Sequence, residues 1–492
     1  MRSVASFAPQ AGRRCHVVWE TYFWPHPNRR EVEGLLEGLL ERASAGGASF
    51  ADLRVLWVEM TSLELKDGEL KQAVEGAEAG FGLRVLVDGH WGFASANDLS
   101  AAAGGTALRR ALAMARATRA RGGEPVRLAD VRPGTGEVVW RPREDPRDMG
   151  IEEKLAMLKE VEAAARAAPH LATVTSSYGE ARRRVRYTST DGADLTWGLT
   201  RILAGADLVA RDGGRSASFY SRVGGVGGLE RLRGPTPAEE AAAAAAAVER
   251  LLAAEASPGG RMTAIIDPEL TGTLVHEAFG HACEADLVLA GESMLAGRLG
   301  EELGSPLVGI FDDPTLDGAF GSLPFDDEGV PARRKVLMER GVLRTYINSR
   351  ETAGRLGMEP NGGARAQDHA SHPLVRMSNT CLAAGDHTFE ELVEGIARGI
   401  YVRGTRGGQV DTAKGTFQFG AQEAFAIEHG EVGRPLRDVA LMGSILDTIR
   451  NVDAVGRDFN LASPGHCGKG QVVPVGDGGP HVRVLDAVVG GM

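Results

Sequence analysis

Four Asp-Gly pairs, each standing between two strand-like segments, most limit how this chain can fold. Asp-Gly accepts the positive φ angles of a two-residue hairpin turn, so each pair predicts two neighbouring antiparallel strands. Helical patterns separate the first hairpins from the second set. We therefore expect an α+β fold of mainly antiparallel sheets with flanking helices, and not a doubly wound parallel sheet. The four pairs are Asp67-Gly68, Asp88-Gly89, Asp191-Gly192 and Asp212-Gly213.

Apolar residues at three- and four-residue spacing predict a first helix from about Asn28, which would be its N-cap. Two further helices are expected at 105–120 and 151–168. The segment 236–256, "TPAEEAAAAAAAVERLLAAEA", is the most helix-prone part of the chain. Its alanines specify little of a core, so we interpret it as a connecting helix that ends at the turn 258–260.

A length of 492 residues predicts at least two large domains. We place an N-terminal tail at 1–27, an α+β domain at 28–235, the connecting helix at 236–260 and a C-terminal domain at 261–492. The C-terminal domain opens with a short strand, after which Asp267 caps a helix that has proline at its first position.

Composition excludes several classes of partner. The net charge of −11 argues against a nucleic-acid partner, because phosphate binding needs clustered cations. No apolar run is long enough for a membrane span or a secretory signal. The four cysteines are too few for a disulfide scaffold in so long a chain, so a cytoplasmic protein with free or metal-bound thiols is expected. They are Cys15, Cys283, Cys381 and Cys467.

The segment 276–286, "HEAFGHACEAD", differs from the zinc-protease motif H-E-x-x-H by one additional residue between its histidines. On a regular α-helix a five-residue step turns by about 500°, so the side chains of His276 and His281 would lie about 140° apart. A π-type turn, or an end of the regular helix before His281, would bring them to one side. Gly280 tolerates such a distortion best. We predict a π-bulge or a helix break at Phe279–Gly280, which a shared metal ion requires.

Three observations favour a metal site over two unrelated histidines. Glu277 occupies the position of the general base in H-E-x-x-H enzymes, the helix is otherwise apolar, and several third ligands are available. The best of these is Cys467 in "SPGHCGKGQ", a soft ligand among glycines that let the backbone approach a metal. Cys283 is better explained by core packing. The other candidates are Glu284 and Asp286, which could instead orient a histidine, and His369 and His372.

Two histidines and one cysteine would leave a fourth position open on a catalytic zinc ion. Zinc in such a site acts as a Lewis acid on water and on the scissile carbonyl. Glu277 would take a proton from the water and pass it to the leaving amine. A closed structural site would need no such base, so a non-catalytic binding or regulatory protein with a structural zinc is the alternative, and a zinc hydrolase of non-peptide amides is a third.

From about residue 30 to its end, the chain resembles the TldD/PmbA family of metallopeptidases, also described as modulators of DNA gyrase. Several motifs in one order carry the resemblance, which is far more specific than H-E-x-x-x-H alone. Besides 276–286 they are "FDDEG" (325–329), "NGGAR" (361–365), "RMSNT" (376–380), "GIYVRGTRGGQVDTAKGTFQFG" (399–420) and "CGKGQVVPVGDGGP" (467–480).

The resemblance implies a cytosolic zinc protease whose C-terminal domain binds the metal through His276, His281 and Cys467, with Glu277 as catalytic base. Because it carries the motif, the chain is similar to the TldD-type subunit. That subunit pairs with a TldE/PmbA-type partner lacking the motif, so a heterodimer or a homodimer is expected. The family acts on unfolded peptides, in maturation of peptide antibiotics and removal of antitoxins. The resemblance gives no role to Arg365, Arg376 and Asn379, which line the site or serve buried hydrogen bonding.

Overall fold

The computed structural model describes residues 29–122, 124–462 and 464–491. The predictions for the tail 1–27, for Cys15 and for the cap at Asn28 lie outside these residues. No helix in the described ranges is long and apolar enough to cross a lipid bilayer.

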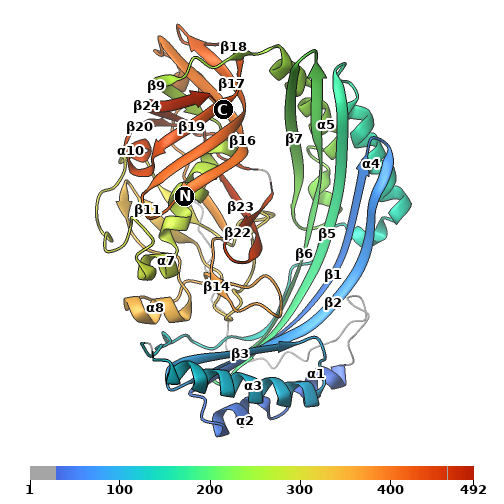
Figure 1. Cartoon of the computed structure of the whole chain (residues 1–492), viewed down its shortest axis with the longest axis vertical. Helices are drawn as coiled ribbons and strands as arrows, with labels where there is room; N and C mark the ends of the chain where they lie inside the picture. The colour runs from blue at the N-terminus through green and yellow to red at the C-terminus, as the bar shows by residue number, and fades with distance from the viewer. Residues whose placement is uncertain (1–28, 123, 463, 492) are drawn as a thin grey trace, which may run out of the picture.

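The N-terminal half of the chain forms one large, curved sheet (Figure 1). Its path is β3-β2-β1-β5-β6-β4, with β7 also paired to β6, and all pairs are antiparallel except β4 with β6. Each Asp-Gly pair lies at the end of a hairpin, as predicted, and all four glycines are in the turns with positive φ angles; Asp212 itself is the last residue of β6. The strands are β1 (Phe50–Lys66), β2 (Glu69–Val87), β3 (His90–Ala96), β4 (Thr135–Val139), β5 (Leu171–Ser189), β6 (Asp194–Asp212) and β7 (Arg215–Val226).

Helices cover this sheet in two groups. One group packs against β1–β3 through leucine and alanine side chains, and the other lies along β5–β7 (Figure 1). The first predicted helix is in fact two, because Gly38 adopts a left-handed conformation with φ 63° between them. The helices are α1 (Arg29–Leu36), α2 (Leu39–Ala45), α3 (Ala101–Ala120), α4 (Ile151–Ala165) and α5 (Pro237–Ala253).

Helix α5 is the predicted alanine-rich helix, and besides connecting the two halves of the chain it packs into the core. Ala241, Ala244 and Val248 are fully or almost fully buried in a cluster with α4 and with strands of the sheet. Small side chains thus let α5 lie close to the sheet, a use of alanine that the sequence argument missed. Where the domains divide around this helix stays a prediction.

The C-terminal half contains two further sheets. In the first, β16, β9, β24, β19 and β17 pair in succession, and β17 pairs back to β16, so these five strands close into a ring; β18, β8 and β20 attach to it. The strands are β8 (Glu255–Ala256), β9 (Gly260–Ile266), β16 (Arg398–Asp411), β17 (Thr416–Glu428), β18 (Glu431–Arg437), β19 (Val439–Ser444), β20 (Val452–Val455) and β24 (Val482–Gly491).

The second sheet has the order β12-β11-β10-β15-β23-β21, with β22 paired to β23. Both sheets share one hydrophobic core with the segment that follows β9. The strands are β10 (Ile310–Asp312), β11 (Lys335–Glu339), β12 (Val342–Leu343), β13 (Ala364–Arg365), β14 (Leu374–Val375), β15 (Asn379–Leu382), β21 (Asn460–Leu461), β22 (Gly465–Gly468) and β23 (Val472–Gly479); β13 and β14 pair separately. The helices are α6 (Pro268–Thr273), α7 (Ala285–Ala290), α8 (Arg350–Leu356), α9 (Phe389–Val393) and α10 (Ile445–Arg450).

The architecture is therefore α+β with mostly antiparallel sheets, as the turns predict. In Figure 1 the long strands of the N-terminal sheet curve past the C-terminal half, which lies on their inner side. Strand β7 lies at one end of this arc and β3 at the other, beside helix α3.

Candidate metal centre

The helix that carries the histidine motif changes its winding before the second histidine. It begins at Asp267, whose carboxylate accepts the backbone N–H of Leu270, and α6 then continues into a π-helical segment at Leu274–Gly280. There the N–H of His281 donates to the carbonyl of His276, five residues earlier. The two imidazole rings consequently lie 5.4 Å apart, centre to centre. The predicted distortion is confirmed, and it spans the whole motif.

Gly280 is required for a different reason from the one inferred from sequence. Its φ of −59° and ψ of −50° are ordinary right-handed helical values, which any residue can adopt. A Cβ atom at this position would instead lie 2.1 Å from the sulfur of Met377 and 3.3 Å from Thr380 Cγ2. The glycine thus allows the π-helical segment to pack closely against β15 and the residues just before it.

Three donors of the predicted set lie together. One ligand atom from each of His276, His281 and Cys467 falls within 4.8 Å of the others, and Cys467 Sγ lies 3.2 Å from His281 Nε2. All three side chains are buried, and Nδ1 of His276 has no hydrogen-bond partner within the described part of the chain. In tetrahedral zinc sites the ligand atoms are roughly 3–4 Å apart. Two imidazoles and a thiol at this spacing fit such an ion.

Cys467 reaches the histidines from a β-hairpin, although the sequence suggested a loop. It lies on β22, opposite Val473 of β23. Arg376 binds this hairpin, donating to the carbonyl oxygens of Cys467 and Gln471 at 2.6 Å each. Because Arg376 is almost completely buried, the position of the hairpin is firmly fixed.

Glu284 orients the second histidine. Its Oε2 lies 2.8 Å from His281 Nδ1 and 3.2 Å from Lys469 Nζ, and the side chain is fully buried. With Nδ1 bound to a carboxylate, Nε2 of His281 is directed toward Cys467, the arrangement in which a histidine usually binds a metal. Glu284 therefore holds His281 in place and is not among the three clustered donors.

Burial lowers the pKa of both histidines, but their closest neighbours shift the two pKa values in opposite directions. Burial, and secondly the proximity of His281, lower the pKa of His276 to about 3, so its imidazole is neutral and able to bind a metal. Burial also acts to lower the pKa of His281, but Glu284 and Cys467 outweigh it and raise this pKa to about 10.

Glu277 lies beside these donors but remains accessible. Its Oε2 is 3.7 Å from His281 Nε2, and its side chain is 34% exposed. Burial of the carboxyl raises the pKa of Glu277, His281 opposes this, and Glu284 adds to it. A partly accessible carboxylate with a raised pKa has the properties of a general base.

The other candidate ligands lie elsewhere. Cys283 is packed in the hydrophobic core, as expected. Asp286 pairs with Lys469 at 2.8 Å. His369 Nε2 contacts Asn97 Oδ1 at 2.9 Å, and the ring of His372 packs on Trp91 and Phe93, so both contact the N-terminal sheet.

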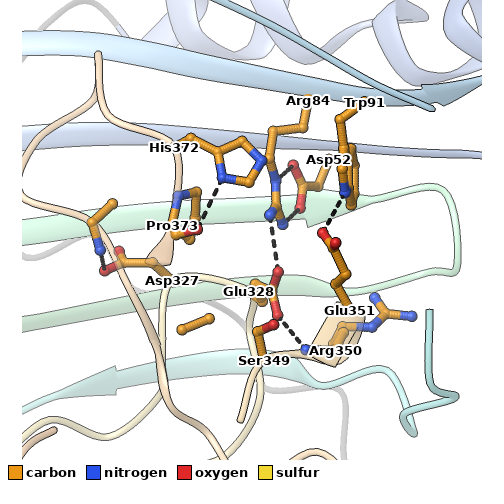
Figure 2. Close-up of polar contacts among 12 residues, drawn as sticks. Asp52, Arg84, Trp91, Asp327, Glu328, Ser349, Arg350, Glu351, His372 and Pro373 are labelled. Carbon is orange, nitrogen blue, oxygen red and sulfur yellow. Dashed lines mark hydrogen bonds and ion pairs between the residues drawn. The ribbon is translucent and has the colours of Figure 1, made fainter. Parts of the chain in front are cut away.

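No role for "FDDEG" followed from the sequence, and the structure places this segment at the contact between the two halves of the chain. Arg84 of β2 is bound by Asp52 of β1 and donates to Glu328 Oε1 at 2.9 Å; Glu328 Oε2 in turn accepts the backbone N–H of Arg350 at 2.8 Å (Figure 2). The neighbouring Asp327 pairs with Arg183 at 2.7 Å. In the sequence this segment was marked by a run of three acidic residues. The arginine partners of Glu328 and Asp327 are 244 and 144 residues away.

Arg365 and Asn379 also serve buried hydrogen bonding. Arg365 donates to the carbonyls of Met377 and Pro474, and the Asn379 amide contacts Gly321, Asp313 and Ser322. These contacts fix the segments around β15 and β23 behind the metal centre.

Comparisons with known proteins agree with this fold. Three family models match: "PmbA/TldA metallopeptidase domain 1" at residues 51–118, the central domain at 144–255 and the C-terminal domain at 259–491. A metalloprotease of Methanothermobacter thermautotrophicus is 43% identical over 90% of this chain and 95% of its own length. A zinc metalloprotease TldD homolog of Saccharolobus solfataricus is 38% identical over 47% of this chain and 52% of its own.

The crystal structure of TldE from Thermococcus kodakarensis covers 93% of this chain and 100% of its own, with a TM-score of 0.74 at 19% identity. That likeness concerns the fold alone. The sequence matches define the class, which is that of the metallopeptidases. Within this class, the chain belongs to the PmbA/TldD family.

Proposed function

We propose that this chain is a zinc-dependent peptidase that hydrolyses small or unfolded peptides. The observation that carries the proposal is the convergence of His276, His281 and Cys467 with the carboxylate of Glu277 at 3.7 Å from His281. A closed structural site would need no accessible carboxylate beside it. The name of the Saccharolobus relative, a zinc metalloprotease, supports the choice of metal.

Each residue has a distinct task in this proposal. His276, His281 and Cys467 would hold zinc, which supplies a Lewis acid to polarise a carbonyl and acidify water. Glu277 accepts the proton of the attacking water and delivers it to the leaving amine. Glu284 keeps Nδ1 of His281 protonated and its Nε2 directed at the site. Arg376 keeps the Cys467 hairpin in place.

We also propose that the chain acts as the TldD-type subunit of a dimer in the cytoplasm. The partner would be a TldE/PmbA-type subunit or a second copy of this chain. The fold shared with TldE supports this, since subunits with one fold can pair through equivalent surfaces.

Replacing Glu277 tests the function directly. We expect Glu277→Gln to lower kcat for unstructured peptides by about 100- to 10,000-fold, because the variant cannot accept the proton. Bound zinc should be unchanged, since Glu277 is not among the clustered donors. Peptide cleavage is assayed with and without a TldE-type subunit, and zinc is measured on the same samples.

Glu292→Gln is the matched control, because this exposed residue on the turn after α7 makes the same chemical change away from the site. It should cleave like the wild type. Zinc binding without Glu277-dependent cleavage in either preparation would contradict the proposal and favour a structural zinc.

A further inference from the structure

A pocket rich in arginine lies between the N-terminal sheet and the C-terminal half. Its enclosed space is small, about 20 Å³, and it opens to solvent. Strands β5 and β6 contribute one wall, and the residues around "FDDEG" together with Arg365, the last residue of β13, contribute the other. We call it the arginine pocket; its lining residues are Arg183, Trp197, Leu199, Arg201, Leu323, Phe325, Asp327 and Arg365.

The arginine pocket carries an excess of positive charge. Three of its lining side chains are arginines, and Asp327 is its single acid. That acid is shared, because it pairs with Arg183 at 2.7 Å and with Arg54, outside the pocket, at 3.4 Å. Burying cations without enough counter-charge is costly, so an anion would be favoured here.

The guanidinium groups also have donors to spare. Arg201 is 7% exposed, and it donates from Nε to the carbonyl of Phe320 and from Nη2 to that of Ser322. Its Nη1 has no hydrogen-bond partner among the residues that the structure describes. The Nε of Arg183 is buried and likewise without a partner. Burial and the nearby Arg365 and Arg183 lower the pKa of Arg201, a repulsion that a bound anion would relieve.

The arginine pocket adjoins the metal centre through the Cys467 hairpin. Arg365 donates from Nη2 to the carbonyl of Pro474 at 2.6 Å, and Pro474 lies opposite His466 in the β22–β23 pair. His466 directly precedes Cys467, and its ring packs on Phe320, whose carbonyl binds Arg201. The arginine pocket and the candidate metal centre therefore lie at adjacent residues of one hairpin, whose side chains point to opposite faces of β22.

We propose that the arginine pocket binds a carboxylate group of the peptide substrate, an inference that rests on the proposed peptidase function. Guanidinium groups match the planar carboxylate and form strong, charge-assisted hydrogen bonds to it. The apolar side chains of Trp197, Leu199 and Phe325 supply contact for the neighbouring aliphatic part of the substrate. The carboxylate can come from the C-terminus of the peptide or from an aspartate or glutamate side chain.

Three peptides of one core sequence distinguish these sources: one with a free C-terminal carboxylate, one amidated and neutral, and one amidated with a single glutamate. We expect the wild type to show a KM about 10- to 100-fold lower for a carboxylate peptide than for the neutral one, as expected for hydrogen bonds to a charged group. A low KM for the free acid alone assigns the C-terminus, and a low KM for the glutamate peptide assigns the side chain. Equal KM values for all three would overturn the proposal.

Two variants test the pocket itself. Arg201→Gln and the less buried Arg183→Gln should each raise KM for the carboxylate peptide far more than KM for the neutral peptide. Arg186→Gln is the control, because it lies on the same strand but three residues away and so on the opposite face, where it pairs with Asp194. An equal loss for all three peptides in both pocket variants would indicate a merely structural role and reject the proposal.

Binding separates this inference from the proposed function. The same peptides are titrated by calorimetry into zinc-loaded Glu277→Gln, which should bind without cleaving. A carboxylate preference in binding, combined with no cleavage by the wild type, would retain the arginine pocket and reject the peptidase. Cleavage without any carboxylate preference would retain the peptidase and reject the pocket.

Discussion

At the scale of single residues, Gly280 is the most restricted position of the motif. Any side chain there meets Met377 Sδ at 2.1 Å, in a core that has no space to yield. We expect Gly280→Ala to reduce the free energy of unfolding by about 1–3 kcal/mol, the usual cost of overpacking. It should also lower zinc affinity, because His281 follows directly. Urea unfolding and zinc titration measure the two effects.

Gly105→Ala is the matched control for Gly280→Ala. Gly105 also lies within a helix, α3, but a Cβ there meets only the end of Arg109, at 3.7 Å. Removing a helical glycine should stabilise the protein by about 0.5–1 kcal/mol. If Gly280→Ala behaved like this control, the close approach to Met377 would not be what requires the glycine.

The role of a residue can be predicted from the sequence where it depends on neighbours along the chain. It cannot be decided where it depends on which side chain the residue contacts in the folded protein. His276, Glu277 and His281 could be recognised because their spacing forces one helix to distort. Glu284 was ambiguous, since a carboxylate near a histidine can bind a metal or hold the imidazole, and only the contact with His281 decides.

At the scale of elements, the Cys467 hairpin depends on Lys469 in its turn. Lys469 Nζ binds Asp286 and the carbonyl of Val375, and lies 3.2 Å from Glu284. We expect Lys469→Met to weaken zinc binding by about 10- to 100-fold, because the hairpin and Glu284 both lose their anchor. Competition with a chelator of known affinity measures the change.

Lys414→Met is the control for this prediction. Lys414 also lies in a hairpin turn, between β16 and β17, but its side chain is 79% exposed and pairs only with Asp411. Its loss should leave zinc affinity unchanged, as exposed pairs contribute little. Equal affinities in the two variants would show that the turn lysine does not position Cys467.

The hairpins of the N-terminal sheet were predictable, and other element-level features were not. Asp-Gly turns are set by the φ angles of two residues, so local sequence suffices. The break between α1 and α2 at Gly38 and the burial of α5 depend on the sheet beneath them. The ring of the C-terminal half depends on β9 and β24, which arrive from its two ends and pair between β16 and β19.

At the scale of the whole molecule, one buried ion network joins the two halves. Arg84, Asp52 and Glu328 each have side chains that are at most 4% exposed, and Glu328 also fixes the start of α8 through Arg350. Their sequence separations made this network invisible before the fold was known. The network holds the N-terminal sheet against the loop that contains Glu328. Asp327, the residue before Glu328, lines the arginine pocket.

Replacing Arg84 by leucine should therefore destabilise the protein strongly. The variant leaves two buried carboxylates without their cation, for which a loss of about 3–5 kcal/mol in the free energy of unfolding is expected. Arg119→Leu removes a pair with Asp88 whose side chains are 61% and 55% exposed, and should cost less than about 1 kcal/mol.

Combining Arg84→Leu with Asp52→Asn and Glu328→Gln should restore part of the stability, because the uncompensated charge is gone. Urea unfolding of all three variants measures their free energies of unfolding. Equal losses for Arg84→Leu and Arg119→Leu would mean that the network does not hold the halves together.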